Sequence, residues 1–181
     1  MAIRLVVMDL DGCINDNWQL FGALETKMYE LMELHSVQFA LCTGRRPMEA
    51  YYFMHQAKFP FRWAGCGGGI IIDKPMEKEK IKDLFDDFAI QTIRGGGFHK
   101  VGRLLVIKER AGVTDDEMLY IEDNANRNAD IADVKKRVKC RIGTPATSNS
   151  DWLKHVKESG GYISLFPVGE GTLDILEHYF G

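Results

Sequence analysis

Three carboxylates follow two short apolar runs of the sequence, where the chain is predicted to leave a buried sheet. Asp9 and Asp11 come after Ile3–Met8, in a glycine-containing turn, and Asp123 comes after Met118–Ile121. Clustered carboxylates repel one another unless a cation joins them, and oxygen ligands without His or Cys favour a hard ion such as Mg²⁺. The sequence therefore predicts a Mg²⁺ site at these carboxylates.

A second set of side chains could hold a phosphoryl group beside that site. Thr43, Gly44 and Arg45 follow the apolar run Val37–Cys42, and Lys100 stands at the start of a predicted helix. The ammonium of Lys100 and the hydroxyl of Thr43, with nearby backbone amides, can neutralise the charge on phosphoryl oxygens. One carboxylate could then attack phosphorus, and a second could protonate the leaving oxygen and later activate water.

Strands and helices are predicted to alternate along the chain. Continuous apolar runs with β-branched residues, separated by segments of helical periodicity, are typical of doubly wound α/β folds. The predicted strands are 3–8, 37–42, 118–121, 139–142 and 162–165, apolar residues also stand at 61–64 and 70–73, and the predicted helices are 24–35, 48–57, 101–111 and 129–138. In an open α/β sheet, ligands bind beyond the carboxyl ends of the strands. We therefore predict a doubly wound, mostly parallel Rossmann-like sheet that carries the site at this edge.

One charge-rich segment interrupts the alternation. Lys74–Ile90 carries apolar residues on one helical face, and three consecutive glycines follow at 95–97. We interpret 74–97 as a small insert in a single domain spanning 1–181, and a normal crossover helix of the sheet is an equally weighted alternative. The glycine cluster at 65–69 lacks the Lys and Ser/Thr of a P-loop, so it is predicted to form a turn at an edge of the sheet.

The composition limits the classes of function to consider. The chain has 181 residues, of which 45% are hydrophobic and 27% charged, and a net charge of -3, which is typical of one globular domain. The slight acidic excess argues against nucleic-acid binding. The four cysteines show no CxxC spacing and are predicted to be reduced thiols, and no stretch approaches the roughly 20 apolar residues of a membrane span. We expect a cytoplasmic protein that binds neither nucleic acid nor membranes.

In their order and spacing, these motifs together resemble the haloacid dehalogenase superfamily of aspartate-nucleophile phosphatases, across nearly the whole chain. Asp9–Gly12 is similar to its first motif, DxDG, Thr43–Arg45 to its second, Lys100 to its third, and Asp123 with Asn126 to its fourth, GDxxND. The end of the chain, from Gly161 to Glu177, is similar to that of the Cof-type and 3-deoxy-octulosonate 8-phosphate phosphatase branches.

The resemblance implies a role for each motif residue. Asp9 would be the nucleophile and a Mg²⁺ ligand, and Asp11 the general acid/base, which also offers its backbone carbonyl to the metal. Asp123 would be the remaining protein ligand, while Thr43 and Lys100, with Gly44 and Arg45, would bind phosphate. Family members without the second Asp, such as the dehalogenases, do not act as phosphatases. The resemblance therefore implies a Mg²⁺-dependent phosphomonoester hydrolase with an aspartyl-phosphate intermediate, acting on a small phosphorylated metabolite such as a sugar phosphate.

The fourth motif departs from the family pattern at two positions. Glu122 stands where Gly is usual, and Arg127 stands where a second acidic residue is usual. Arg127 could remove a carboxylate that orients a metal-bound water, pair with Glu122, or bind an anion of the substrate, and Asp130 is a poorly aligned substitute for the missing acid. The alternative function is therefore a catalytically weak protein of the same fold that binds a phosphorylated ligand or a protein partner.

The spacing of the motifs also limits the cap, the insertion by which this family sorts its substrates. Thr43 follows Asp9 by 34 residues (43 minus 9), which leaves room only for a short flap at Gly12–Leu20. The 56 residues between Thr43 and Lys100 (100 minus 43 minus 1) are few for the full α/β cap of Cof-type enzymes. A comparatively open site is expected, and a homo-oligomer is plausible because small-capped members often complete their pockets through oligomers.

Overall fold

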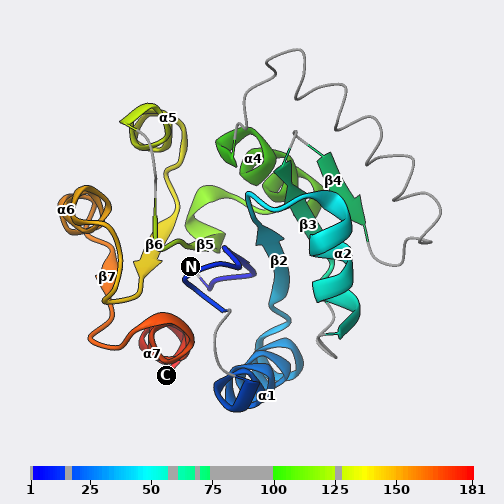
Figure 1. The fold of residues 1–181 in the computed structure, drawn as a ribbon. Helices are drawn as coiled ribbons and strands as arrows, with labels where there is room; N and C mark the ends of the chain where they lie inside the picture. The colour runs from blue at the N-terminus through cyan, green and yellow to red at the C-terminus, as the bar shows by residue number, and fades with distance from the viewer. Residues whose placement is uncertain (1, 15–17, 57–60, 68–69, 74–99, 125–127) are drawn as a thin grey trace.

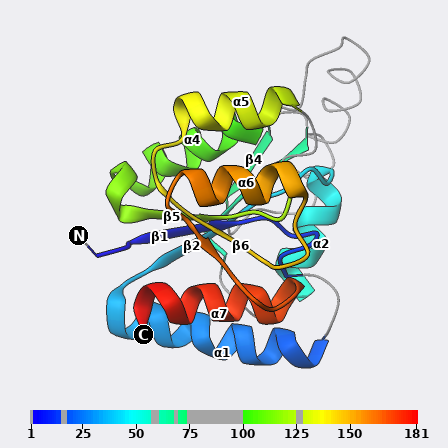
Figure 2. The same ribbon diagram turned by 90° about the vertical axis from the view of Figure 1, so that its left-hand side faces the viewer.

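The computed structural model describes residues 2–14, 18–56, 61–67, 70–73, 100–124 and 128–181. Within these ranges the chain forms a seven-stranded sheet in the order β4-β3-β2-β1-β5-β6-β7, with helices on both faces (Figures 1 and 2). The strands are β1 (Leu5–Met8), β2 (Gln38–Cys42), β3 (Trp63–Cys66), β4 (Ile70–Asp73), β5 (Met118–Ile121), β6 (Arg141–Thr144) and β7 (Tyr162–Ile163). The helices are α1 (Trp18–His35), α2 (Pro47–Gln56), α4 (Lys100–Ala111), α5 (Asn128–Arg137), α6 (Ser150–Glu158) and α7 (Val168–Phe180), with a 3-10 turn at Asp115–Glu117.

All neighbouring strands are parallel except β3 and β4, which pair in antiparallel fashion at one edge. The central strand β1 pairs on one side with β2 and on the other with β5, so that Met8 lies opposite both Leu41 and Ile121. The residues that follow these strands are therefore brought to the same edge of the sheet.

The sheet separates two apolar cores. Along β1, Val6 and Met8 belong to the core beneath α1, α2 and α7, whereas Leu5 and Val7 belong to the core beneath α4, α5 and α6. All four residues are fully buried. A strand whose successive side chains enter opposite cores must be apolar throughout, which explains the continuous apolar run of the sequence.

The mostly parallel α/β sheet predicted from the sequence is confirmed, and β5 has the predicted bounds. The predicted strand 139–142 corresponds to β6, which begins and ends two residues later. Gly143 lies within β6, where a side chain would collide with Ile175 of α7. Helices α6 and α7 were not predicted. Of the predicted flap, Trp18–Leu20 belong to α1.

Two sequence predictions concern the region around β4. Gly65 of the glycine-rich cluster lies in β3, which pairs in antiparallel fashion with the edge strand β4, and residues 68–69, where a turn is predicted, lie outside the described residues. The predicted insert at 74–97 lies entirely outside them.

Candidate active site

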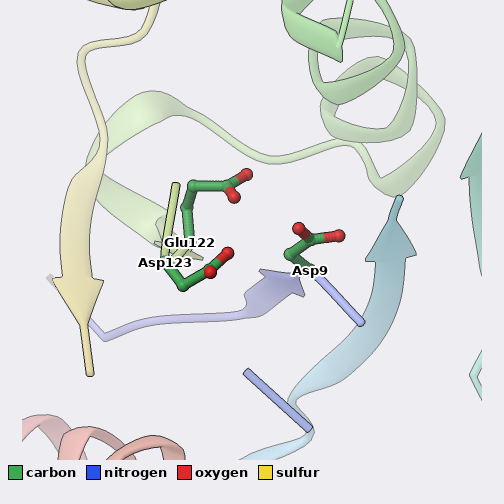
Figure 3. A group of neighbouring side chains, drawn as sticks. All are labelled: Asp9, Glu122 and Asp123. Atoms are coloured by element: carbon green, nitrogen blue, oxygen red, sulfur yellow. The ribbon is translucent and has the colours of Figure 1, made fainter. Parts of the chain in front are cut away.

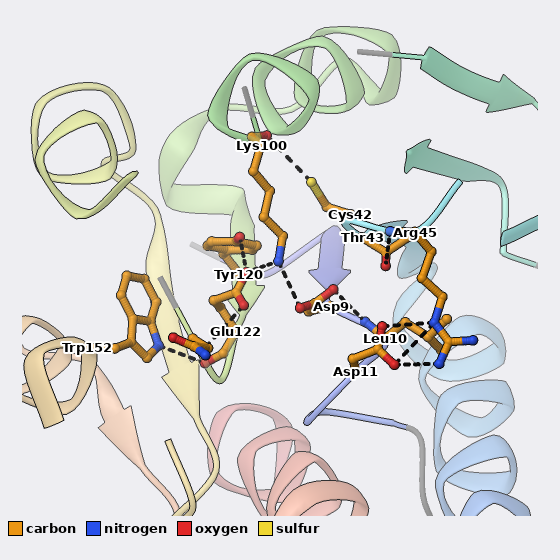
Figure 4. Close-up of polar contacts among 11 residues, drawn as sticks. Asp9, Leu10, Asp11, Cys42, Thr43, Arg45, Lys100, Tyr120, Glu122 and Trp152 are labelled. Atoms are coloured by element: carbon orange, nitrogen blue, oxygen red, sulfur yellow. Dashed lines mark hydrogen bonds and ion pairs between the residues drawn. The ribbon is translucent and has the colours of Figure 1, made fainter. Parts of the chain in front are cut away.

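Asp9 follows β1 directly and is only 7% exposed. Its backbone amide donates to the carbonyl of Ile121 at 2.9 Å, which continues the β1–β5 ladder by one residue. Its two carboxylate oxygens have different partners: Oδ1 accepts the backbone amide of Leu10 at 2.8 Å, and Oδ2 pairs with Nζ of Lys100 at 2.8 Å (Figure 4). These contacts fix the orientation of the carboxylate.

Two further acidic side chains approach Asp9 from the end of β5. Glu122 and Asp123 follow that strand, and one carboxylate oxygen of each lies within 4.8 Å of one another and of Asp9 (Figure 3). Burial raises the pKa of Asp123, and the charge of Asp9 raises it further. Oxygen donors this close suit a hard divalent cation, which would relieve their repulsion. Among the described residues, the carboxylates of Asp9, Glu122 and Asp123 thus form a donor set that fits Mg²⁺.

A tight loop holds Asp123 against the segment that follows β1. Gly12 has a φ of 80°, a conformation that side chains rarely adopt, and a Cβ there would overlap the carboxylate of Asp123. The loop is also anchored from α7, where the hydroxyl of Thr172 donates to the carbonyl of Cys13 at 2.6 Å. The positive φ of Gly12 and the close approach of the Asp123 carboxylate therefore both require glycine at position 12.

Replacing Gly12 by Ala is expected to displace the carboxylate of Asp123 and to weaken Mg²⁺ binding at least 10-fold, as measured by calorimetry. The left-handed backbone should also cost roughly 1–2 kcal/mol in the free energy of unfolding. Gly112→Ala is the matched control, since Gly112 has a φ of 65° but open space around it. It should lose similar stability and no Mg²⁺ affinity. Equal Mg²⁺ affinities in the two variants would contradict this role of Gly12.

Lys100 enters the cluster from the first residue of α4. Its Nζ lies 2.8 Å from Oδ2 of Asp9 and 2.5 Å from Oε2 of Glu122 (Figure 4). Burial lowers the pKa of Lys100, but the charges of Glu122 and Asp9 outweigh this effect, so the ammonium stays protonated. The backbone of Lys100 is also held, because its carbonyl accepts the thiol of Cys42 at 3.5 Å.

Thr43, Gly44 and Arg45 follow β2 on the other side of Asp9. Thr43 is fully buried, and its backbone amide donates to the carbonyl of Gly65 at 2.8 Å. Its hydroxyl accepts the backbone amide of Arg45 at 3.2 Å, which shapes a tight turn. Gly44, at the middle of the turn, is exposed.

Asp11 points away from the acidic cluster, toward Arg45. The guanidinium Nε lies 3.1 Å and 2.9 Å from the two carboxylate oxygens of Asp11, and Nη2 lies 2.5 Å from Oδ1. This pairing raises the pKa of Arg45. The Asp11 side chain is half exposed, so an ion pair of this kind contributes little to stability and can open at small cost. The carboxylate of Asp11 is therefore not part of the cluster that fits a metal.

The structure adds supporting residues that sequence reasoning missed. The indole N–H of Trp152 in α6 donates to the backbone carbonyl of Glu122 at 2.7 Å, and the hydroxyl of Tyr120 donates to its carboxylate at 2.5 Å. Trp152 is fully buried in the core beneath α4, α5 and α6. Its buried N–H needs an acceptor, but the sequence does not indicate which one.

The remaining residues of the predicted fourth motif are outside the described part. Asn126 and Arg127 lie in 125–127, so the three proposed roles of Arg127 stay predictions. Asp130 lies in the first turn of α5. Among the described residues, no helix combines the length and apolarity needed to cross a bilayer.

A family model described as haloacid dehalogenase-like hydrolase matches residues 6–178. No curated protein matches the sequence.

Several solved structures share the fold at low sequence identity. A sucrose-phosphatase from Synechocystis sp. PCC6803, in complex with sucrose and phosphate, is 12% identical with a TM-score of 0.70, covering 99% of this chain and 98% of that one. A haloacid dehalogenase-like hydrolase from Bacillus subtilis is 13% identical with a TM-score of 0.64, covering 99% and 91%. The cobalt-bound deoxy-D-mannose-octulosonate 8-phosphate phosphatase from Haemophilus influenzae is 16% identical with a TM-score of 0.55, covering 96% and 81%.

Proposed function

Because the chain belongs to the haloacid dehalogenase-like hydrolases, we propose that it is a Mg²⁺-dependent phosphomonoester hydrolase that works through an aspartyl-phosphate intermediate. The observation that carries the proposal is the environment of Asp9. This buried carboxylate lies at the carboxyl end of the central strand, paired with Lys100 and close to Asp123. An oriented carboxylate beside a cation and a metal-binding donor set is suited to attack phosphorus.

In the first half of the reaction, a carboxylate oxygen of Asp9 forms a bond to phosphorus as the bond to the ester oxygen breaks. Asp11 donates a proton to the leaving oxygen, which departs as an alcohol. For this step the Asp11 side chain must leave Arg45, take up a proton from solvent and turn toward the substrate. Lys100, with the Thr43 hydroxyl and the backbone amides of its turn, stabilises the charge on the phosphoryl oxygens.

In the second half, Asp11 takes a proton from a water molecule that attacks the phosphorus of the aspartyl-phosphate. The bond between phosphorus and Asp9 breaks, and inorganic phosphate leaves with the carboxylate restored. Asp9 and Asp123, with the backbone carbonyl of Asp11, would hold Mg²⁺. The bound cation supplies charge neutralisation that lets a phosphate dianion approach a carboxylate.

The proposed activity is tested by steady-state turnover of p-nitrophenyl phosphate and a panel of phosphate esters, with Mg²⁺ or with EDTA. Turnover should require Mg²⁺ and return when Mg²⁺ is restored after chelation. A sucrose-phosphatase and a deoxy-D-mannose-octulosonate 8-phosphate phosphatase share the fold, so sugar phosphates are the first esters to test. A protein that binds phosphate but turns over none of the esters would favour the alternative of a phosphate-binding protein.

We also propose three properties beyond the site itself. Residues 74–97 are proposed to act as a small cap, and the protein is proposed to be a cytoplasmic homo-oligomer. Deleting the insert should change the preference among esters more than the turnover of p-nitrophenyl phosphate, which needs few contacts beyond the phosphoryl group. Sedimentation velocity gives the oligomeric state directly.

A further inference from the structure

Arg103 lies in α4, one helical turn after Lys100, and its side chain is buried. It is only 3% exposed. Its Nε and Nη1 atoms are enclosed and have no hydrogen-bond partner within the part of the chain that the structure describes. A guanidinium carries a positive charge and five N–H donors. Burying such a group without a partner costs free energy, so Arg103 calls for an anion.

The aliphatic stem of Arg103 crosses β3 at a glycine. A Cβ at Gly65 would lie 3.0 Å from Cβ of Arg103 and 3.5 Å from its Cδ, so glycine at this position makes room for the arginine. Gly65 pairs with Cys42 in the sheet, and both stand near the carboxyl ends of their strands. Side chains of a helix tilt toward its amino end, which in α4 is the end that holds Lys100. The stem therefore directs the guanidinium toward the edge of the sheet that carries the site.

The charge of Arg103 acts on the two thiols at that edge. Burial raises the pKa of Cys42, at the end of β2, and of Cys66, at the end of β3, and the charge of Arg103 opposes this rise in both. The thiol of Cys42 donates to the backbone carbonyl of Lys100 at 3.5 Å, and Thr43 follows Cys42 directly. The guanidinium therefore lies beside the turn proposed to bind phosphate, on the side of β3.

The position of Arg103 limits what its anion can be. The phosphoryl group is proposed to bind at Asp9, which follows β1, whereas Arg103 lies over β3, with β2 between the two strands. Neighbouring strands are about 4.8 Å apart, so the two positions are about 10 Å apart. A single phosphoryl group is too small to contact both. A substrate of about the size of a hexose with an anionic group at each end would span them.

We propose that Arg103 is a specificity-determining residue, which binds a second anionic group of the substrate, a carboxylate or a second phosphoryl group, while the ester to be cleaved lies at Asp9. A planar guanidinium binds either kind of oxyanion through paired, charge-assisted hydrogen bonds. The inference rests on the proposed phosphatase activity, and it narrows the substrates to phosphate esters that carry a second negative group.

The test uses two matched pairs of esters, and in each pair only one member carries a second anionic group. The first pair is 6-phosphogluconate and glucose 6-phosphate, and the second is fructose 1,6-bisphosphate and fructose 6-phosphate. The measurement is kcat/KM for phosphate release in saturating Mg²⁺. Wild type should prefer the doubly anionic member of at least one pair by roughly 10- to 100-fold, the usual value of a hydrogen bond to a charged group. The first pair reports on a carboxylate and the second on a phosphoryl group.

Arg103→Met keeps an unbranched stem over Gly65 and removes the charge. The preference within the pair should fall to about twofold or less, mainly through a higher KM for the doubly anionic member, because the lost contact is made in the ground state and the transition state alike. A ratio within a pair cancels any general loss of activity. Arg110→Met is the matched control: the exposed Arg110 lies at the other end of α4 and pairs with Asp73, so this variant should keep the preference of wild type.

Urea unfolding without ester separates this role from a structural one. A buried guanidinium without its anion destabilises the folded protein, so Arg103→Met is expected to have a free energy of unfolding equal to or greater than that of wild type. A lower free energy of unfolding, or a variant that does not fold, would identify Arg103 as a structural residue and overturn the proposal.

Two kinetic results would also overturn it. Equal kcat/KM for both members of each pair in wild type would show that no second anion is recognised, and a preference that persists in Arg103→Met would assign it to another residue. If wild type turns over no ester, p-nitrophenyl phosphate included, the proposed function is wrong, and calorimetry with 6-phosphogluconate and glucose 6-phosphate still tests Arg103. Tighter binding of 6-phosphogluconate by wild type that is lost in Arg103→Met supports the role, and equal binding of the two esters contradicts it.

Discussion

The Asp9→Asn variant is expected to lose phosphomonoester hydrolysis by a factor of about 10³ or more, measured as kcat/KM for p-nitrophenyl phosphate in saturating Mg²⁺. The amide is a far weaker nucleophile than the carboxylate, and it is also a poorer metal ligand. Both losses come from the same substitution, so raising the Mg²⁺ concentration should not restore turnover.

The same substitution should not destabilise the fold. Asp9 shares its surroundings with Glu122 and Asp123, whose oxygens lie within 4.8 Å, and removing one of three like charges relieves repulsion in the absence of metal. Urea unfolding without Mg²⁺ is expected to give Asp9→Asn a free energy of unfolding equal to or greater than that of wild type. A protein stabilised by losing its nucleophile is a common consequence of building an active site from crowded charges.

Asp116→Asn is the matched control for this experiment, since Asp116 is exposed and lies before β5, at the opposite end of the strand from the site. It should retain full activity. If Asp9→Asn also keeps wild-type turnover while remaining folded, the assignment of Asp9 as nucleophile is wrong, and with it the mechanism proposed for this site.

The convergence of Asp9, Thr43 and Asp123 could be predicted from the sequence because it depends on topology alone. Each residue follows an apolar strand, and parallel neighbours bring their carboxyl ends together whatever the details of packing. The family match over residues 6–178 confirms the resemblance drawn from the motifs.

Helices α6 and α7 illustrate what the sequence shows less clearly. In α6, Trp152, His155 and Val156 are buried at helical spacing, and the side chain of Asn149 accepts the amides of the first turn. The apolar residues at helical spacing and the capping residue Asn149 can both be recognised in the sequence of α6. In α7, by contrast, two glycines in the first turns weaken the helical pattern, and Gly171 is needed because a side chain there would meet the backbone of Phe166.

The orientation of side chains within the site could not be predicted. Glu122 is recognisable as a departure from the family pattern, but its contact with Lys100 depends on where α4 begins relative to β5, and its orientation depends on Tyr120 and Trp152. Likewise, the contact of the Arg45 guanidinium with Asp11 could not be predicted, and the binding of phosphate by Arg45 stays a prediction. Such pairings are set by tertiary distances, which motif spacing does not encode.

The Asp11→Asn variant is expected to show the second large loss of turnover, because Asp11 is the proposed general acid/base. Turnover of p-nitrophenyl phosphate should fall by 10²–10⁴-fold, the usual contribution of a general acid/base. Mg²⁺ affinity, measured by calorimetry, should change little, because the proposed metal contact of Asp11 is its main-chain carbonyl and its carboxylate lies outside the acidic cluster. A collapse of Mg²⁺ affinity in this variant would contradict that division of roles.

Arg45→Gln separates the two possible reasons for such a loss. If Asp11 served only to hold Arg45 against the substrate, Arg45→Gln and Asp11→Asn would lower turnover by the same factor. If Asp11 is the acid/base, Arg45→Gln should leave kcat within a few-fold of wild type, since the exposed ion pair holds Asp11 away from the substrate and must open in each cycle. We expect the second result, with any effect of Arg45→Gln confined to KM, because an arginine released from Asp11 is free to contact the anionic substrate.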